Sequence, residues 1–192
     1  NIQIWSFLTI QNVPNIMYAG ASPIDIYKSI NFGKSWAKLN TPNIKEHCSG
    51  PFSPRVMRMV QKPGNPQEVY AALEISGAMR TVNGGNTWSD LSDDLIQLAK
   101  LPHLQSSIVQ DKTLAEGMLD AHAITISPLN PERVLIALRM GIFKTDNGGE
   151  NWQDTEIARF SPTTYARDIK TSPHNPNTLY CLLYTSPSPR DH

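Results

Sequence analysis

An eight-residue pattern that occurs three times constrains this chain more than any other feature of its sequence. The copies span residues 29–36, 81–88 and 145–152, and the third reads Thr-Asp-Asn-Gly-Gly-Glu-Asn-Trp. All three share a hydroxyl residue, Asn, Gly and Trp at the same spacing. Because the pattern recurs, we expect the fold to be built from similar units that each contain the same turn.

The shared positions suit a tight β-hairpin. A short Asn side chain accepts hydrogen bonds from backbone N–H groups just after it and closes a turn locally. Gly supplies the positive φ that such a turn needs, and Trp begins the outgoing strand with a large apolar surface to bury. The residues predicted to build the turns are Asn31, Gly33, Trp36, Asn83, Gly85, Trp88, Asn147, Gly149 and Trp152.

A longer repeat surrounds each octet. Pro14, Pro66 and Pro131 precede the three Trp residues by 22, 22 and 21 residues, and apolar stretches flank each proline. Each unit therefore reads as strand, proline turn, strand, loop, strand, octet turn, strand. Four short antiparallel strands per unit, at a period of roughly 45 to 65 residues, predict an all-β fold of β-propeller blades. A fourth unit begins at Pro176 and does not reach its octet.

The repeat divides the chain into predicted segments. Residues 1–40, 55–90 and 120–155 form three blades, and 165–180 start a further blade. Residues 91–119 are an insertion between blades. In it, Ser92 is expected to cap a helix over 93–100, with Leu91, Leu95 and Leu98 on one face. This helix either covers the edge of a blade or forms a lid over a site.

The octets resemble the Asp-box, or BNR, repeat of sialidases, sortilin-type receptors, xyloglucanases and photosystem II assembly factors. That family has Asp where all three copies here have Asn, which keeps the acceptor oxygen and removes the charge. The resemblance, which extends to bacterial BNR-repeat proteins, implies that the box is structural and lies away from any active site. It also implies a seven-bladed ring, of which this chain would be about half, so the end blades should expose apolar faces.

The two ends of the chain carry their own expectations. Residue 1 is Asn and no signal segment follows it, so we expect a truncated N-terminus, which leaves the localisation open. Residues 181–192 resemble the translation of an adaptor used in metagenomic sequencing. We expect this segment to be an artefact.

Composition narrows the range of partners. The chain has 17 basic and 17 acidic residues, so no net field favours nucleic acid. Its longest apolar runs have the length of strands, which predicts no membrane insertion. His47 and Cys48 form an isolated pair, so we expect no metal, and no phosphate-binding glycine loop precedes a helix, so we expect no cofactor.

Strand direction sorts the loops onto two faces. The proline turns and the boxes share the bottom face, whereas the starts of the innermost strands and the long insertions share the top face. Alignment on the prolines places one set of side chains in a row at the top rim, a second set beside it, and a third, apolar row that should pack between blades. The rows are Trp5, Met57, His122 and Arg167; Ser6, Arg58, Ala123 and Asp168; and Phe7, Met59, Ile124 and Ile169.

A cationic group of side chains is predicted at this rim. The guanidinium groups suit an anionic or polyhydroxyl ligand, and an aromatic ring can stack on it. The ligand-binding candidates are Trp5, Arg55, Arg58, Arg139, His122 and Arg167. The alternative is that they are solvated side chains or local ion pairs, such as Arg167 with Asp168.

Two function classes follow from these residues. One is a non-catalytic recognition or scaffold propeller that binds a protein, a glycan or a small anionic ligand. The other is a glycoside hydrolase, which needs two carboxyl groups about 5 to 10 Å apart. Its weak catalytic candidates are Glu74, Asp120, Asp168 and Tyr165, and no spacing ties any two together. The sequence favours recognition, and carboxyl groups that prove scattered or ion-paired would count against the hydrolase.

Overall fold

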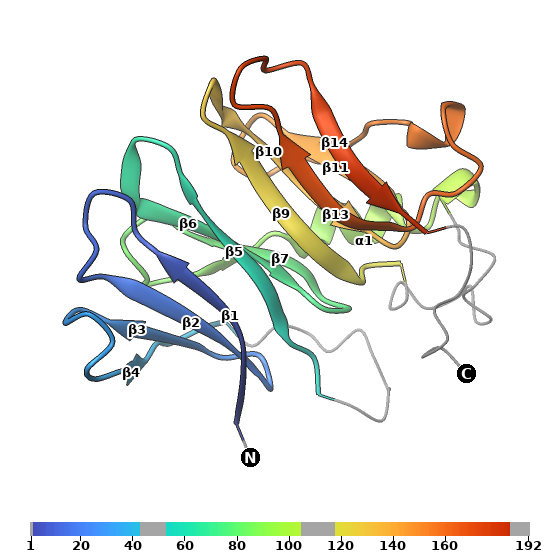
Figure 1. Cartoon of the computed structure of the whole chain (residues 1–192). Coiled ribbons are helices and arrows are strands. Elements are labelled where there is room, and N and C mark those ends of the chain that lie inside the picture. The colour runs from blue at the N-terminus through green and yellow to red at the C-terminus, as the bar shows by residue number, and fades with distance from the viewer. Residues whose placement is uncertain (1, 43–52, 105–117, 185–192) are drawn as a thin grey trace.

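The computed structural model describes residues 2–42, 53–104 and 118–184. In these ranges, three four-stranded antiparallel sheets and one two-stranded sheet follow one another along the chain (Figure 1). Blade 1 comprises β1 (Gln3–Thr9), β2 (Met17–Ser22), β3 (Ile26–Ser29) and β4 (Ala37–Lys38). Blade 2 comprises β5 (Val56–Lys62), β6 (Asn65–Leu73), β7 (Gly77–Thr81) and β8 (Ser89–Asp90). Blade 3 comprises β9 (Ala121–Ser127), β10 (Asn130–Leu138), β11 (Gly141–Thr145) and β12 (Gln153–Asp154), and the partial blade comprises β13 (Ala166–Thr171) and β14 (Leu179–Leu183).

The strands of each sheet lie in chain order, as the predicted all-β fold requires. β14 continues to Leu183, three residues into the segment that the sequence predicts to be an artefact. The origin of that segment stays a prediction. No helix in the described part of the chain is long and apolar enough to cross a membrane.

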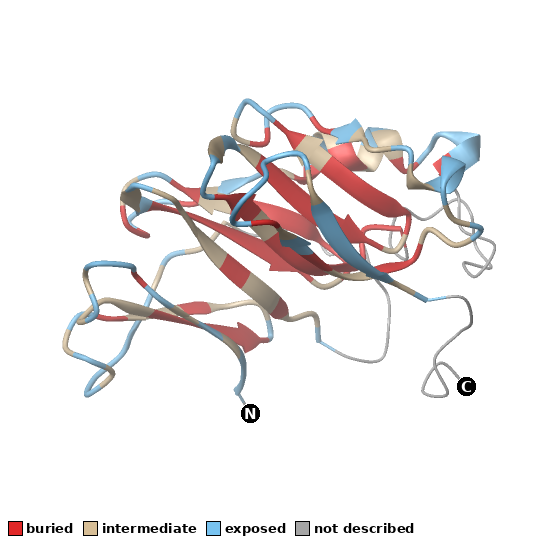
Figure 2. Ribbon diagram, turned by 45° about the horizontal axis from the view of Figure 1, so that its top comes forward, coloured by how far each residue is buried: buried red, intermediate tan, exposed pale blue. Residues whose placement is uncertain are grey.

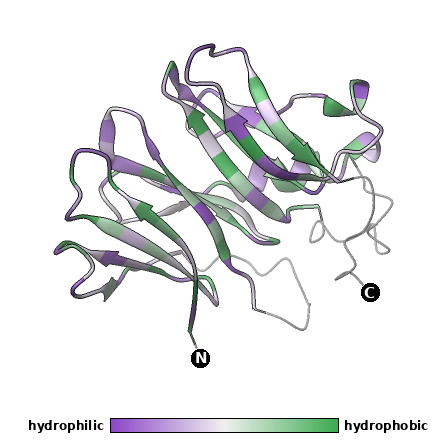
Figure 3. Ribbon diagram, in the orientation of Figure 1, coloured by the Kyte–Doolittle hydropathy of each residue, from purple (hydrophilic) through white to green (hydrophobic). Residues whose placement is uncertain are grey.

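The blades pack face to face, with the innermost strands β1, β5, β9 and β13 side by side (Figure 1). Figure 3 shows hydrophobic residues concentrated on the strands. They form three clusters: one between blades 1 and 2, which includes Tyr18 and Met79, a second between blades 2 and 3, and a third between blade 3 and the partial blade. Each junction therefore buries apolar surface from two neighbouring sheets, which is the main stabilising contribution available to this architecture.

Burial is uneven along the series of blades. Figure 2 shows buried residues concentrated in the middle sheets, while the sheet next to the N-terminus is more exposed. In the row predicted to pack between blades, Met59, Ile124 and Ile169 are buried, but Phe7 is 63% exposed. The prediction is wrong for Phe7 because no described residues cover that side of blade 1. Its ring instead packs edge-on against Trp36, at a centroid distance of 6.1 Å.

All three boxes form the same local turn. Asn Oδ1 accepts a hydrogen bond from the backbone N–H four residues later, at 2.9 Å for Asn31, 2.9 Å for Asn83 and 3.1 Å for Asn147. The hydroxyl residue that opens each box accepts a bond from the N–H of its glycine, as Thr81 does from Gly85 at 2.9 Å. The expected turn chemistry of Asn and Gly is thus present in every copy.

Each box after the first is also held by the blade before it. Lys28 Nζ donates to the Gly84 carbonyl at 2.6 Å, and Arg80 Nη1 donates to the Gly148 carbonyl at 3.3 Å. These two side chains occupy equivalent positions in β3 and β7, and we call them hook cations. A leucine that follows the outer strand, Leu39 or Leu91, packs against the same two junctions.

Helix α1 (Ser92–Leu98) follows blade 2 directly, and the short 3-10 helices η1 (Pro102–Leu104) and η2 (Ile157–Arg159) lie in later connections. Ser92 does not cap α1 as predicted: Leu91 holds the N-cap position without a side-chain bond, and the Ser92 hydroxyl donates to the Ser76 carbonyl at 2.6 Å. A buried hydroxyl needs such a partner, and the Ser76 carbonyl, just before β7, provides it.

The predicted apolar face of α1 is present. Leu95 is fully buried between blades 2 and 3, and Leu91 and Leu98 pack against the same cluster. On the polar side, Asp94 Oδ2 accepts a 2.6 Å bond from the backbone N–H of Trp152. The helix therefore covers the outer edge of a blade junction. Residues 105–117 of the insertion lie outside the described residues, so the choice between an edge cover and a lid stays a prediction.

Candidate functional site

The start of every innermost strand is irregular, and the irregularity falls at the predicted rim row. The register breaks between Ile4 and Ser6 in β1, and between Val56 and Arg58 in β5. Equivalent breaks occur in β9 and β13. The residues left out of the pairing are Trp5, Met57, His122 and Arg167. A β-bulge re-aims the side chain it displaces, and in each blade the displaced residue lies near the start of the innermost strand, at the top face, which is toward the lower right in Figure 1.

Five side chains from blade 3, the approach to β13 and β13 itself meet at this row. Arg139 Nη2 donates to Asp120 Oδ2 at 2.9 Å, and His122 Nε2 lies 3.2 Å from the same oxygen. The Tyr165 hydroxyl lies 3.1 Å from His122 Nε2 and accepts a 2.6 Å bond from Arg167 Nη1. We call Asp120, His122, Arg139, Tyr165 and Arg167 the rim cluster.

Tyr165 organises the rim cluster. Its ring lies 4.6 Å from the Arg139 guanidinium carbon and 5.0 Å from that of Arg167. Since an aromatic face attracts a guanidinium, one ring and one hydroxyl fix both arginines. The Tyr165 side chain is 4% exposed, so this support is buried while the cations approach the surface. The sequence placed Tyr165 only as a weak nucleophile candidate.

Burial and neighbouring charges act in opposite directions on Asp120. Burial alone would raise its pKa, but the hydrogen bonds and charges of His122 and Arg139 outweigh burial and hold the pKa of Asp120 below its ordinary value. The carboxylate is therefore ionised at neutral pH. Its second oxygen, Oδ1, is buried and has no hydrogen-bond partner among the described residues.

A second group lies on blades 1 and 2. The Arg55 guanidinium stacks on Trp5, 4.0 Å from the ring centroid, and its Nε lies 2.9 Å from Glu74 Oε2. Trp5 is 46% exposed and offers ring surface to solvent. Burial raises the pKa of Glu74, and the charge of Asp120 adds to the rise, although Arg55 and Arg167 oppose it. The rim cluster and this second group thus face one another closely enough to interact electrostatically.

The remaining rim carboxylate pairs with an arginine of a different blade. Asp168 of β13 binds Arg58 of β5, two blades away, and Lys170 Nζ lies 4.0 Å from it. The expected local pair of Arg167 with Asp168 is wrong. Because Arg167 is displaced by the bulge, it turns toward Tyr165 and His122.

Within the described residues, one rim arginine differs from the other three because it forms no ion pair with a carboxylate. Arg55, Arg58 and Arg139 each face a carboxylate: Glu74, Asp168 and Asp120. Arg167 has no carboxylate within ion-pair distance in residues 2–42, 53–104 and 118–184. The sequence could not identify this difference, since it depends partly on the pairing of Arg58 with Asp168, which lie 110 residues apart.

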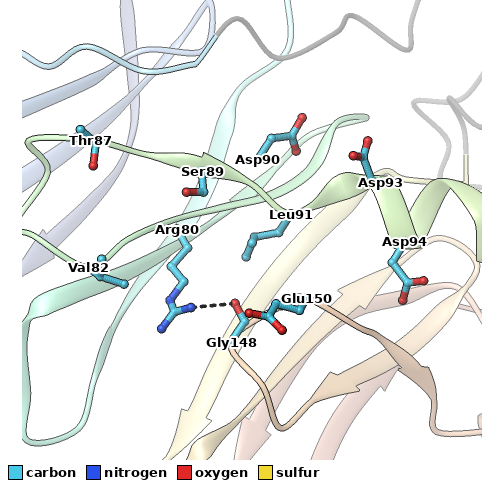
Figure 4. A pocket seen from close by; sticks show the side chains of 11 residues that line it. Arg80, Val82, Thr87, Ser89, Asp90, Leu91, Asp93, Asp94, Gly148 and Glu150 are labelled. Carbon is cyan, nitrogen blue, oxygen red and sulfur yellow. Dashed lines mark hydrogen bonds between the residues drawn. The ribbon is translucent and has the colours of Figure 1, made fainter.

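A separate cleft of about 470 Å³ lies on the outer side of the junction between blades 2 and 3 (Figure 4). Arg80 and Leu91 form one wall and the third box forms the other, with the acidic side chains Asp90, Asp93, Asp94 and Glu150 around it. None of the predicted rim residues lines it. Within the described ranges, no group of three or more His, Cys, Asp or Glu side chains is placed to hold a metal ion, and His47 and Cys48 lie outside those ranges.

Comparison with known proteins identifies the fold. No protein-family model and no curated protein sequence matches the chain. An ancestral GH74 enzyme superposes with a TM-score of 0.65 at 17% identity, over 98% of this chain and 23% of that one. The GH74 enzyme of Niastella koreensis gives 0.59 at 14%, over 94% and 26%, and YCF48 from Cyanidioschyzon merolae gives 0.56 at 14%, over 96% and 57%.

These likenesses show a β-propeller fold and nothing finer. The chain spans 23% and 26% of the length of the two GH74 enzymes. The same fold is found both in those enzymes and in YCF48, so it does not decide between the two function classes. The BNR assignment and the number of blades in the complete ring stay predictions.

Proposed function

We propose that this β-propeller chain is a non-catalytic recognition module whose rim cluster binds a small anionic or polyhydroxyl ligand, or a partner that presents such groups. The observation that carries the proposal is that Arg167 forms no ion pair with a carboxylate of the described residues, although the charge of Glu74 reaches it. It is held in place by Tyr165 and His122. A fixed guanidinium that is not already paired with a carboxylate is well suited to bind one.

The charges around Arg167 favour the same ligand class. The rim cluster contains two arginines and one carboxylate, so it has a net positive charge even with His122 neutral. Its cations are preorganised by the Tyr165 ring, which reduces the ordering that binding would otherwise require. On blade 1, the exposed ring of Trp5 offers an apolar surface on which a sugar or other flat ligand can rest.

Calorimetric titration with glucuronate tests the proposal, with glucose as the neutral counterpart. We expect glucuronate to bind, and Arg167→Gln to weaken it about tenfold, since a charged hydrogen bond contributes roughly 1.5 kcal/mol. Arg133→Gln is the matched control, because Arg133 is an exposed arginine paired with Asp146 away from the rim. Binding that survives Arg167→Gln unchanged, or the absence of glucuronate binding, would remove the rim cluster as the site.

The second candidate, a glycoside hydrolase, is favoured by one observation. Glu74 has a raised pKa while the nearby Asp120 has a lowered one, and a general acid and a base need such unlike carboxyl groups. However, each of these groups is engaged by an arginine, which favours a charged receptor over a catalytic pair. Release of reducing sugar from xyloglucan or of sialic acid from sialyllactose, lost on Glu74→Gln, would reverse this choice.

A further inference from the structure

One nitrogen of the rim cluster has more neighbours than it can bind. His122 Nε2 lies 3.2 Å from Asp120 Oδ2, 3.1 Å from the Tyr165 hydroxyl and 3.1 Å from Arg167 Nη1. A ring nitrogen carries either one hydrogen or one lone pair in the plane of the ring, and never both. An ionised carboxylate can only accept a hydrogen bond, whereas a guanidinium can only donate one. Asp120 and Arg167 therefore favour opposite states of the same atom.

The hydrogen bonds around His122 favour a lone pair on Nε2 while the imidazole is neutral. Arg167 Nη1 donates to the Tyr165 oxygen at 2.6 Å, so the hydrogen of that hydroxyl is available for Nε2. Two donors, Tyr165 and Arg167, thus face Nε2. On the other side, Asp120 Oδ2 already accepts a bond from Arg139 Nη2 at 2.9 Å. We expect the neutral imidazole to carry its hydrogen on Nδ1.

A proton added at Nε2 reverses this arrangement. The imidazolium then donates to Asp120, which is buried. Arg167 and Tyr165 lose their acceptor, and two cations lie 3.1 Å apart, which is unfavourable. Arg167 is half-buried, so its guanidinium can turn toward a ligand outside the cluster. An anion bound to Arg167 would offset the repulsion between the two cations.

We propose that His122 is a positioning residue whose proton releases Arg167 from the rim cluster, so that the site takes up an anion and a proton together. The link to a ligand rests on the proposed function, whereas the competition at Nε2 does not. A histidine suits this role, because imidazole is the side chain that ordinarily changes its charge between about pH 5 and 8. By linkage, an anion that binds better beside protonated His122 must bind more tightly as the pH falls through that range.

The titratable and charged groups around His122 come from three parts of the chain. They are Asp120 and Arg139 of blade 3, Tyr165, Arg167 and Tyr184 of the partial blade and its approach, and Glu74 of blade 2, whose charge reaches Asp120 and Arg167. Glu74 is the other group whose loss of charge would favour an anion, since burial raises its pKa. Its effect has to be separated from that of His122.

Nitrogen NMR of the unliganded chain tests the competition at Nε2. The chain has five histidines, and the spectrum of His122→Gln identifies the signals of His122. We expect the neutral ring to carry its hydrogen on Nδ1. Arg167→Met removes the donors but keeps a long side chain. In this variant the share of the Nε2–H form should grow, and the midpoint of the His122 titration should rise by about one pH unit, because a neighbouring cation is lost.

Arg133→Gln is the control for this measurement, because Arg133 pairs with Asp146 away from the rim. It should change neither the tautomer nor the midpoint. A neutral ring of the unaltered chain with its hydrogen on Nε2, or a midpoint that Arg167→Met leaves in place, would overturn the positioning role of His122.

Calorimetric titration with glucuronate at two pH values tests the link to a ligand. A carboxylate of this kind stays ionised above about pH 5, so a change in affinity above that pH comes from the protein. We expect binding to be about tenfold tighter at about pH 5.5 than at about pH 7.5, with proton uptake that appears as a dependence of the heat on the buffer. His122→Gln should bind with the same affinity at both values, because its amide accepts and donates at any pH. Glu74→Gln should retain the pH dependence.

The outcomes separate this role of His122 from the proposed function. Absence of glucuronate binding at both pH values would overturn the proposed function and the link to a ligand, while the NMR result still decides whether His122 positions Arg167. Binding through Arg167 without proton uptake would overturn the link and leave the proposed function in place. A pH dependence that Glu74→Gln abolishes and His122→Gln retains would assign the proton to Glu74 instead.

Discussion

Box 1 and box 3 have the same pattern and the same turn but very different surroundings. Trp36 is 36% exposed, and its indole N–H donates to the Gly33 carbonyl of its own box at 3.0 Å. Trp152 is 3% exposed, and its indole N–H donates to the Leu91 carbonyl of the preceding blade at 3.2 Å. The box therefore specifies the hairpin, whereas the blade before it supplies the burial that makes Trp an anchor.

The largest expected difference is between the stability losses caused by replacing Trp152 and Trp36. Trp152→Ala should lower the free energy of unfolding by about 4 kcal/mol, since it leaves a cavity between blades 2 and 3. Trp36→Ala should cost clearly less, because 36% of this residue is already exposed and no described blade packs over it. Urea unfolding of both variants measures the difference. Similar losses at the two sites would mean that the anchor role is local to the box.

A smaller effect should distinguish the glycines at the fifth box position. Gly149→Ala is expected to cost about 2 to 3 kcal/mol, because its Cβ would lie 2.5 Å from Leu91 in addition to the backbone strain at a positive φ. Gly33→Ala incurs only the backbone strain, about 1 kcal/mol. Thermal unfolding of the two variants side by side checks this. An equal loss of stability would show that the Leu91 side chain moves away from the added Cβ.

The smallest difference is expected for the asparagines. Asn31→Ala and Asn147→Ala should each cost about 1 kcal/mol, because both remove the same local bonds to the turn. If the two losses differ by more than about 0.5 kcal/mol, a limit typical of additive and independent sites, then the turn also depends on its neighbours.

Local chemistry explains which parts of the fold the sequence predicts. The Asn and Gly of each box act through bonds to residues within four positions, so their pattern predicts the turn reliably. Strand order follows, because proline and box turns leave only one antiparallel path. Ser92 shows where such local prediction fails. It has the right residue type and position for a cap, but its hydroxyl donates a hydrogen bond to a carbonyl 16 residues away.

The rim depends on contacts that the sequence does not encode locally. Alignment on the prolines predicted the row of Trp5, His122 and Arg167, but not the bulges that displace these side chains. The pairing of Arg58 with Asp168 spans 110 residues and joins strands of different blades. The bulge turns Arg167 toward Tyr165 and His122, and Asp168 is taken by Arg58, so neither contact of this adjacent pair could be read from the sequence.

The hook cations give the assembly of this chain a direction. Lys28 and Leu39 lie earlier in the chain than the second box, which they contact, and Arg80 and Leu91 lie earlier than the third. During synthesis, every box after the first therefore emerges from the ribosome when its receiving surface has already been made. Domains tend to fold in this order as they are translated, so each finished blade can act as the template on which the next one closes.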